Sequence, residues 1–498
     1  MSSLNFLKSK WIYGVLAVLL AIIGYSLVPS EQYTQAPIMA AIVIIMAVFW
    51  IFEVVPIAIT SLFPIFLFPL FGILDTKSTA LFFGKEIIFL FLGGLMLAQG
   101  IQNSNLHKRI ALHIVNLIGS KPANLVLGFM VATAGLSMWI SNTASVMVMM
   151  PIGLSIIQEI KEVKNSESFL SKFAVALMLG IAYSADIGGM ATLIGTPPNM
   201  VFMELYHELF PNLRKVGFTQ WMMMGLPVAV TFLFTGWLLM TKVIFRMPKG
   251  NIFDGNDIIK NLLSQLGKVR RDEIASGLIF LSAAILWVTG SDITLSESFT
   301  IHGWRTSFGL EMVSDASIAV ATSLLLFLIP SNDRPTEKLL TWNKARELPW
   351  GILLLFGGGF AIAGGFNSSG LSSLIGNLFA SLEIDSPILI VLIVCVVLTF
   401  LTEITSNTAT TNLILPILAK ASVVLGLDPR ILMIPATLSA SCAFMMPIAS
   451  PTQAIIFGSG HVKIKQMIRA GILFNLWGVI IVTSVFYLMA KFVFGIAI

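Results

Sequence analysis

The chain has 498 residues, of which 56% are hydrophobic and only 11% are charged. Soluble domains carry about 25% charged residues, so this composition excludes an ordinary soluble globular protein. The net charge of +5 is expected from basic membrane loops and does not indicate nucleic-acid binding. The two cysteines, Cys395 and Cys442, lie in apolar runs, which indicates packing residues and not a disulfide framework.

Apolar runs that end at proline, glycine or charged residues predict an all-α polytopic membrane protein with about eleven transmembrane helices. The first run follows Lys8 and Lys10, and we interpret it as an uncleaved helix, because the residues after it make a poor cleavage site for a signal peptide. In chain order, the expected spans are 11–28, 36–55, 57–73, 80–102, 171–210, 219–246, 274–291, 312–330, 348–368, 430–460 and 470–495.

Two further apolar stretches, 122–157 and 387–425, are too long for one span and carry polar residues near their middle. We interpret them as re-entrant hairpins that enter and leave the membrane on the same side. With a cytoplasmic N-terminus, this scheme places most of the 30 Lys and Arg residues inside, as membrane topology requires, and none in the outer stretch 371–386. We therefore expect a multi-pass protein of the plasma membrane with its C-terminus outside.

An internal repeat relates the two hairpins. Each contains the string Ser-Asn-Thr-Ala, which begins at Ser141 in the first and at Ser406 in the second. The shift that carries Ser141 to Ser406 also pairs Phe91 with Phe356, Gly93 with Gly358, Gly100 with Gly365, Ser104 with Ser369, Leu106 with Leu371 and Pro151 with Pro416. A shift that stays constant over so long a stretch indicates duplication.

The duplication predicts four parts: an N-terminal helix at 1–35, a first repeat at 36–246, a cytoplasmic linker at 247–273 and a second repeat at 274–498. Five crossings separate the starts of the two repeats, and an odd number gives them opposite orientations. Inverted repeats with interrupted segments at matching places are typical of alternating-access transporters.

The Ser-Asn-Thr strings supply groups that can bind ions at membrane depth, where irregular backbone is tolerated only if it lines a cavity or is buried in protein. Each string begins a half-helix, whose free N–H groups and positive dipole end favour an anion. The hydroxyls can donate to a carboxylate, and the Asn amide can serve an anion and a cation with its two ends. A string that merely caps a helix is the alternative for one copy, and the repetition argues against it.

A second pair of interruptions follows the hairpins, at Gly195-Thr196-Pro197 and at Ala449-Ser450-Pro451. Proline breaks a helix and frees carbonyl groups, which together with hydroxyls make an oxygen cage for a hard cation such as sodium. A simple proline kink is the alternative. Ser137 and Thr402, which the shift of the repeat also pairs, lie four residues before each Ser-Asn-Thr string, one turn away on the same helical face.

These paired motifs resemble those of the divalent anion/sodium symporter family, over essentially the whole chain. The resemblance implies a homodimer with a scaffold domain and a moving, elevator-type transport domain. It also implies small dicarboxylates, namely succinate, malate, fumarate or 2-oxoglutarate, as substrates and one sodium ion at each hairpin tip. The substrate residues carried over by motif are Ser141, Asn142, Thr143, Thr196, Pro197, Ser406, Asn407, Thr408, Ser450 and Pro451.

The sodium ligands carried over in the same way are Ser137, Ser141, Asn142 and the Gly195 carbonyl at the first tip, and Thr402, Thr405 or Ser406, Asn407 and the Ala449 carbonyl at the second. Some members of the family exchange dicarboxylates without sodium, and many of these carry an Arg just after the string. Ser145 and Thr410 occupy those places here, which favours sodium symport. A sodium/proton or inorganic-oxyanion antiporter of related architecture is the alternative.

Other classes of function fit the sequence less well. A channel is disfavoured by the inverted duplication. No nucleophile–base pair or histidine spacing indicates an intramembrane enzyme. Intramembrane carboxylates are functional candidates by default. Glu403, three residues before Ser406, is a candidate for a role near the cation, and Asp186, Glu53 and Glu86 lie within or near other spans.

Overall fold

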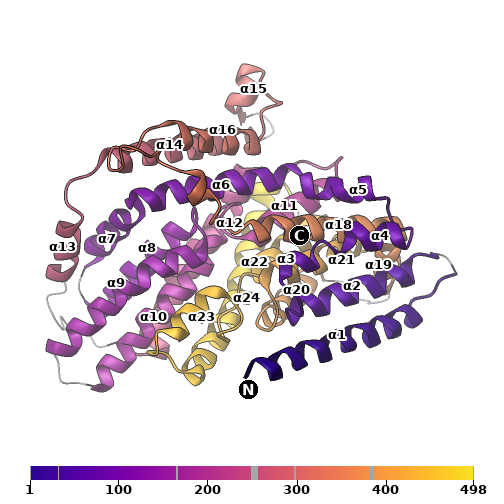
Figure 1. Cartoon of the computed structure of the whole chain (residues 1–498), viewed down its shortest axis with the longest axis horizontal. Helices are drawn as coiled ribbons and strands as arrows, with labels where there is room; N and C mark the ends of the chain where they lie inside the picture. Colours follow the sequence, from indigo (N-terminus) through magenta and orange to yellow (C-terminus); the bar gives the residue numbers. More distant parts are fainter. Residues whose placement is uncertain are drawn as a thin grey trace.

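The structure is a computed structural model that describes residues 2–31, 33–119, 121–163, 167–247, 256–296, 299–380 and 386–496. Helices form most of the described chain, as Figure 1 shows. The first half contains α1 (Ser2–Leu27), α2 (Ala36–Ile51), α3 (Ile57–Thr60), α4 (Phe63–Leu70), α5 (Thr76–Leu81), η1 (Phe82–Gly84), α6 (Glu86–Ser104), α7 (Leu106–Ile118), α8 (Pro122–Ser137), α9 (Asn142–Val163), α10 (Glu167–Gly189), α11 (Pro197–Leu209), α12 (Phe218–Leu238) and the π-helical η2 (Leu239–Ile244).

The second half follows the same general order after a short helix in the linker. Its elements are α13 (Asn256–Gln265), α14 (Arg271–Val288), β1 (Ile293–Ser296), β2 (Phe299–Ile301), α15 (Trp304–Phe308), α16 (Asp315–Leu328), α17 (Trp342–Ala345), α18 (Trp350–Ser369), α19 (Leu371–Ala380), α20 (Pro387–Leu401), α21 (Asn407–Val424), α22 (Pro429–Ser439), α23 (Pro451–Gly458) and α24 (Ile464–Phe494).

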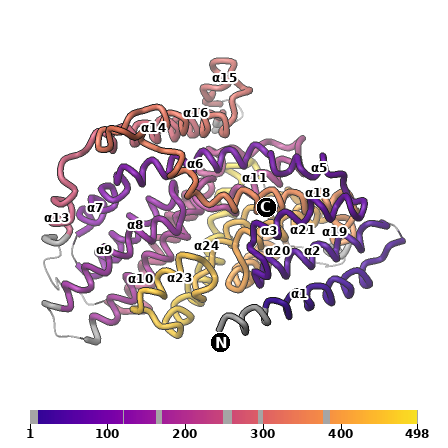
Figure 2. Tube along the Cα trace, in the orientation of Figure 1, coloured from indigo at the N-terminus to yellow at the C-terminus, as the bar shows by residue number. Residues whose placement is uncertain are grey.

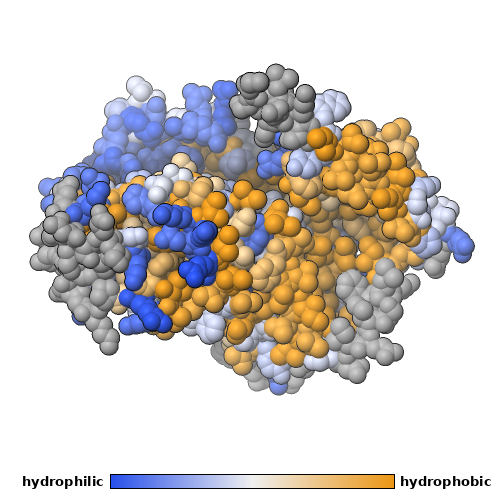
Figure 3. Space-filling model, turned by 90° about the horizontal axis from the view of Figure 1, so that it is seen from below, coloured by the Kyte–Doolittle hydropathy of each residue, from blue (hydrophilic) through white to orange (hydrophobic). Residues whose placement is uncertain are grey.

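The apolar surface confirms a polytopic membrane protein. Among the described residues, seven helices are long and apolar enough to cross a bilayer, and further apolar helices are shorter. Large hydrophobic side chains are exposed along α1, α14, α20 and α24. The face in Figure 3 is correspondingly dominated by hydrophobic residues, with hydrophilic ones gathered toward one end. Exposed apolar area of this extent is stable only against lipid or a partner.

Three features differ from the expectation. The span 57–73 is divided between α3 and α4, and the loops expected at 103–121 and 371–386 contain the helices α7 and α19. These begin at Leu106 and Leu371, a pair that the shift of the repeat already relates. Sequence reasoning missed α7 because the polar residues Lys108, Arg109 and His113 interrupt its apolar run.

The loop after α14 contains strands as well as a helix. It carries the antiparallel pair β1 and β2, in which Thr294 lies opposite Thr300 and a bulge follows. The predicted linker 247–273 lies partly outside the described residues. Its described part forms α13, which packs on α7, and Arg109 of α7 holds the end of the linker through the Gly267 carbonyl (3.1 Å) and Glu273 (2.5 Å).

The duplicated glycines make equivalent helix contacts. A Cβ at Gly93 of α6 would come within 2.6 Å of the Ala319 backbone on α16, and one at Gly358 of α18 would come within 2.5 Å of the Ser61 backbone between α3 and α4. Each glycine thus allows its helix to approach another backbone more closely than any side chain would permit. The equivalence supports the duplication inferred from sequence.

The two halves exchange the helices that follow their interruptions. The helix α11 of the first half packs against α21 and α22 of the second, whereas α23 of the second half packs against α9 and α10 of the first. Figures 1 and 2 show this crossing, with yellow α23 beside magenta α10 and with α11 near α21. Each hairpin is therefore completed by a helix from the other half of the chain.

Candidate functional site at the hairpin tips

The tip of the first hairpin is a short turn between α8, which ends at Ser137, and α9, which begins at Asn142. The Ser137 hydroxyl donates to Asn142 Oδ1 over 2.7 Å. Ser141 precedes the helix, and its Oγ accepts the Ala144 N–H at 3.3 Å, so it caps α9. The expected helical turn from Ser137 to Ser141 is therefore wrong: the chain leaves the helix here, and a hydrogen bond across the turn joins Ser137 to Asn142.

The tip of the second hairpin repeats this hydrogen bond. Thr402 follows α20, α21 begins at Asn407, and the Thr402 hydroxyl lies 2.6 Å from Asn407 Oδ1. The same hydroxyl lies 2.9 Å from the carbonyl of Ala440, the first residue after α22. A duplicated pair of residues thus takes up the same geometry twice, with a hydroxyl fixing the oxygen end of each Asn amide.

The first interruption separates α10, which ends at Gly189, from α11, which begins at Pro197. The expectation that proline breaks this helix is wrong, because the helix has already ended at Gly189. Proline instead occupies the first position of the next helix, where its missing N–H costs nothing. Asn199 closes the interruption by donating to the carbonyls of Gly189 (3.0 Å) and Thr192 (2.7 Å).

The oxygen atoms expected at the first cation site do converge. A Cβ built at Gly189 would lie 2.7 Å from Asn142 Oδ1 and 3.2 Å from the Gly195 carbonyl, so both oxygens line the same small space beside this glycine. The Ser137 hydroxyl adjoins it through Asn142. Hydroxyl, amide and carbonyl oxygens suit a hard cation such as sodium. The residues present therefore fit a sodium ion at this tip.

The second interruption, residues 440–450, lies between α22 and α23, and Pro451 again begins the following helix. Glu403 fixes its course: Oε1 accepts the N–H groups of Phe444 (2.7 Å) and Met445 (2.9 Å), and Oε2 accepts that of Met446 (3.0 Å). Asn475 of α24 adds a donor at 2.7 Å. Glu403 therefore holds the backbone of the interruption, and its carboxylate is occupied.

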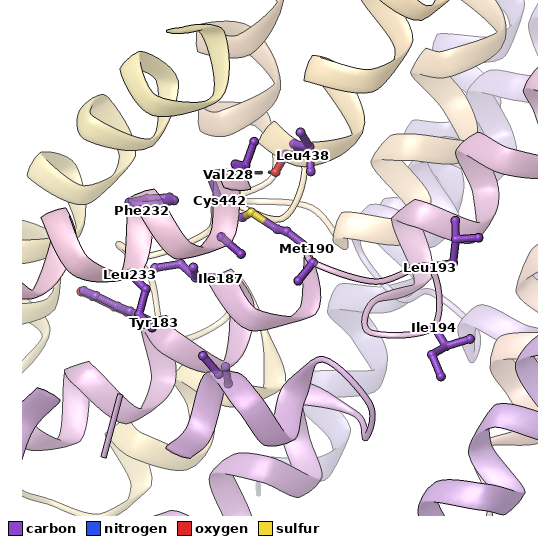
Figure 4. Packing of buried hydrophobic residues seen from close by; sticks show 14 of the residues in the cluster. Tyr183, Ile187, Met190, Leu193, Ile194, Val228, Phe232, Leu233, Leu438 and Cys442 are labelled. Carbon is purple, nitrogen blue, oxygen red and sulfur yellow. Dashed lines mark hydrogen bonds between the residues drawn. The ribbon is translucent and has the colours of Figure 1, made fainter. Parts of the chain in front are cut away.

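Apolar packing joins the second interruption to the first half. Tyr183 of α10 donates to the Phe444 carbonyl over 2.8 Å. Figure 4 shows Tyr183 and Ile187 of α10 close to Phe232 of α12, with the buried Cys442 of the interruption beside them. Both cysteines are buried free thiols, which confirms their packing role. The interruption of one half is thus seated on the helices of the other.

The remaining predicted residues lie in the same region but are not equally placed. Thr143 is half-buried, Thr408 is buried, and both stand in the first turns of their helices. Thr196 and Ser450 are buried at the positions that precede α11 and α23, beside the half-buried Pro197 and the exposed Pro451. Half-buried Ser406 precedes α21. All of them lie at helix N-termini, where N–H groups are free.

One predicted cation ligand at the second tip, Thr405, has other contacts, and the Ala449 carbonyl is not among the described hydrogen-bond partners of Thr402. The Thr405 hydroxyl lies 2.8 Å from the Leu401 carbonyl and 2.5 Å from Thr410 Oγ1, so it joins the two arms of the hairpin. The carbonyl that approaches Thr402 is instead that of Ala440, which carries no sequence signal.

Asp186 is a functional candidate whose position beside the first tip could not be predicted from the sequence. It stands one turn before the end of α10, is 1% exposed, and accepts a hydrogen bond from Asn142 Nδ2 at 3.0 Å. Its position within a span made it a candidate by default, but nothing in the sequence linked it to the first tip. A fold with α10 packed along α8 and α9 brings them together.

The positive charge at the tips comes from the N-termini of helices. Among the described residues, no Lys or Arg side chain forms a hydrogen bond with Ser137, Asn142, Thr402 or Asn407. The N-termini of α9 and α21 carry the positive ends of their helix dipoles, about half a charge each. This arrangement can bind an anion, but its charge is too small to balance a dianion without a bound cation.

A charged cavity of about 570 Å³ lies elsewhere, between α6, α11, α12 and the segment before α16. Its lining includes Arg214, Lys215, Arg305, Glu204 and Asp315, and none of the predicted site residues. On the expected topology it opens on the outer face. We do not assign the transport site to this cavity, because the paired tips and their interruptions lie outside it.

Comparison with known proteins identifies the family. The family described as "Sodium:sulfate symporter transmembrane region" matches residues 7–496. The sodium-dependent dicarboxylate transporter SdcS of Staphylococcus aureus strain NCTC 8325 is 43% identical over 489 residues, which cover 97% of this chain and 91% of SdcS. The SdcS protein of strain MSSA476 matches with the same identity and coverage.

Two solved structures share the fold at low sequence identity. The YdaH transporter of Alcanivorax borkumensis aligns with a TM-score of 0.55 and 14% identity, over 81% of this chain and 86% of that one. The MtrF protein of Neisseria gonorrhoeae aligns with a TM-score of 0.56 and 11% identity, over 96% and 94%. The duplicated tips, the helical membrane fold and the match along nearly the whole sequence agree: the chain belongs to the sodium:sulfate symporter family, the divalent anion/sodium symporters.

Proposed function

We propose that this protein is a secondary transporter of C4 and C5 dicarboxylates, such as succinate, malate, fumarate and 2-oxoglutarate, coupled to sodium symport. The observation that carries the proposal is the repeated tip geometry, in which Ser137 and Thr402 hold the oxygen ends of Asn142 and Asn407 at 2.7 and 2.6 Å. Two equivalent anion-binding tips suit a substrate with two carboxylates. The relationship to SdcS supports the same substrate class.

The substrate contacts follow from the orientation of the amides. With Oδ1 of each Asn directed to a hydroxyl, the amide nitrogen is left to donate elsewhere. Asn407 Nδ2 and the N–H groups at the start of α21 would receive one carboxylate, with the Thr408 hydroxyl beside them. Asn142 has one amide hydrogen engaged by Asp186, and its second hydrogen, with Thr143, would receive the other.

Sodium provides the charge that the protein lacks. Two helix ends supply roughly one positive charge in total, which leaves a dianion uncompensated in a site of low dielectric. A sodium ion at each tip would complete the balance, held at the first by Ser137, Asn142 and the Gly195 carbonyl. At the second, Thr402, Asn407 and the Ala440 carbonyl are the oxygens that lie together.

We further propose that the two repeats are inverted and that the protein works by an elevator-type movement as a homodimer in the plasma membrane. The exchange of α11 and α23 between the halves supports a single moving unit, because each hairpin is packed on an element of the other repeat. A unit built in this way carries both tips together. The N-terminus would then be cytoplasmic and the C-terminus external.

Uptake of radiolabelled succinate into proteoliposomes tests the proposal. We expect uptake that saturates with succinate, requires an inward sodium gradient and is inhibited by malate and fumarate. Sodium and succinate should raise each other's affinity by the same factor. Counterflow of succinate without any sodium dependence would replace symport by exchange. Transport of sulfate in preference to succinate would favour the oxyanion alternative and contradict the substrate assignment.

A further inference from the structure

The carboxylate of Asp186 is held between the two halves of the chain. It accepts a hydrogen bond from Asn142 Nδ2 (3.0 Å) on the first hairpin and from Gln453 Nε2 (3.3 Å) on α23. The Thr452 hydroxyl lies 3.0 Å from Oδ2 and 3.2 Å from Oδ1. Within the part of the chain that the structure describes, no Lys, Arg or His forms an ion pair with it.

A buried carboxylate with only neutral donors is incompletely compensated. Removing its charge from water costs several kcal/mol even after the protein relaxes, and neutral hydrogen bonds offset only part of this. A bound cation would offset the remainder, and buried charges in proteins are generally paired or bind metal ions. The site therefore gains most in stability when a cation is next to Asp186.

A comparison with Glu403 shows why Asp186 is suited to a cation. The donors to Glu403 include three backbone N–H groups, which carry no oxygen that could turn toward a metal ion. The three donors to Asp186 are two amides and a hydroxyl, each of which has an oxygen on the same group. Rotation of Gln453 and Thr452 would convert these two donors into oxygen ligands without moving the backbone, while Asn142 keeps its oxygen at the first tip.

A second observation points to the same place. Gln453 is fully buried, and its Oε1 has no hydrogen-bond partner among the described residues, although the nitrogen of the same amide donates to Asp186. An orphaned carbonyl-type oxygen in a buried position is costly. Ser450 Oγ lies 2.6 Å from Thr452 Oγ1 and adds a further oxygen. The second interruption and α23 thus bring several oxygens to the carboxylate on α10.

We propose that Asp186, Thr452 and Gln453 form a further sodium site, distinct from the two tip sites and built from both halves of the chain. One carboxylate with amide and hydroxyl oxygens suits a monovalent ion, since calcium would require more carboxylate charge. The inference rests on the proposed function and deepens it by adding a coupling ion. Through Asn142 the site adjoins the first tip, and through Thr452 it adjoins Ser450, a predicted substrate residue.

The most direct test counts sodium ions bound to the purified protein without substrate. Equilibrium binding of radioactive sodium should give one ion fewer per chain in Asp186→Asn, which keeps the shape of the side chain but not its charge. Thr483→Val, at a buried threonine of α24, is the matched control and should bind the same number as the wild type. An unchanged number in Asp186→Asn would overturn the proposal.

Two further variants test the same site in case Asp186→Asn does not fold. Thr452→Val and Gln453→Met each remove one proposed oxygen ligand while leaving the carboxylate in place. Either should weaken sodium binding by about five- to tenfold, the effect of losing roughly 1 kcal/mol of ligand interaction. If both variants bind sodium as the wild type does, the cluster is a structural network and the proposal fails.

A transport measurement separates this inference from the proposed function. The reversal potential of succinate flux in proteoliposomes gives the number of sodium ions moved per substrate, and Asp186→Asn should move one fewer. A wild type that binds sodium but transports no dicarboxylate would refute only the proposed function. A wild type that transports succinate with the same sodium number as Asp186→Asn would refute only the additional site.

Discussion

The two hairpin tips have the same hydrogen bond and different surroundings. Ser137 and Thr402 each fix the oxygen of an Asn amide, but the nitrogen of Asn142 donates to Asp186, whereas no described side chain accepts from the nitrogen of Asn407. The carboxylate beside the second tip, Glu403, is occupied by backbone N–H groups. Duplication therefore preserved the local geometry, while the packing of α10 on the first hairpin gave only the first tip an available buried charge.

The largest effect is expected when a second charge is placed at each tip. In Asn142→Asp the new carboxylate would lie beside Asp186, and two like charges about 4 Å apart repel by about 4 kcal/mol at an effective dielectric of about 20. At the second tip the nearby carboxylate, Glu403, accepts backbone N–H groups, and no hydrogen bond among the described residues joins it to Asn407, so we expect weaker repulsion in Asn407→Asp. We therefore expect a far larger loss of succinate affinity at the first tip, measured by binding calorimetry. Equal losses would show that Asp186 does not distinguish the two tips.

Removal of either Asn amide should have the next largest effect. Asn142→Ala and Asn407→Ala each delete a half-buried polar partner, at a cost of about 1–3 kcal/mol, or one to two decades of affinity. Uptake of succinate at limiting substrate should fall accordingly in both, with a greater fall at Asn142, whose loss also removes a donor from Asp186. Wild-type uptake in both variants at normal expression would exclude the tips from the mechanism.

Glu403→Gln should lower stability more than it changes coupling. The substituted amide offers one oxygen to the N–H groups of the interruption and turns an NH₂ group toward the rest, so hydrogen bonds worth about 1.5–3 kcal/mol each to a charged acceptor are weakened. We expect a lower melting temperature in detergent and an unchanged number of sodium ions per succinate. A changed sodium number with normal stability would instead make Glu403 part of a cation site.

Loss of the hydroxyl at each tip should have a smaller effect. Ser137→Ala and Thr402→Val remove one neutral hydrogen bond to the Asn oxygen, worth about 1 kcal/mol, or roughly a fivefold rise in the sodium concentration for half-maximal uptake. Thr402→Ser retains the hydroxyl and should behave like the wild type. A rise for Thr402→Ser as large as that for Thr402→Val would assign the effect to packing.

Single cysteines at Lys161 and Ser386, both exposed and each near one hairpin, would test the orientation of the two tips without affecting transport. The native thiols are buried and should not interfere. We expect a membrane-impermeant reagent to reach position 386 from outside in intact cells and position 161 only after the membrane is opened. Labelling of both from one side would contradict the inverted arrangement of the repeats.

Local patterns were sufficient to predict much of this protein. Apolar runs indicate the membrane helices. The polar strings within two long runs indicate the hairpins, because irregular backbone at membrane depth is tolerated only where it is buried in protein or lines a cavity. The constant shift between the repeats related Ser137 to Thr402 before any geometry was known, and the two hydrogen bonds to Asn142 and Asn407 match that relation. The helices α7 and α19 were missed because polar residues interrupt their apolar runs, such as Lys108 and Arg109 in α7 and Ser372 and Ser373 in α19.

The sequence by itself therefore determined the membrane class, the duplication and the two Asn-containing tips, since these depend on composition and on residues close together in the chain. The tertiary structure alone decided which tip receives a carboxylate and which carbonyl approaches Thr402. Asp186 and Thr452 are separated by 266 residues, and they meet only because α23 crosses to pack on α10. The spacing of residues along a chain carries no information on such a crossing, which follows from how complete helices bury their surfaces against one another.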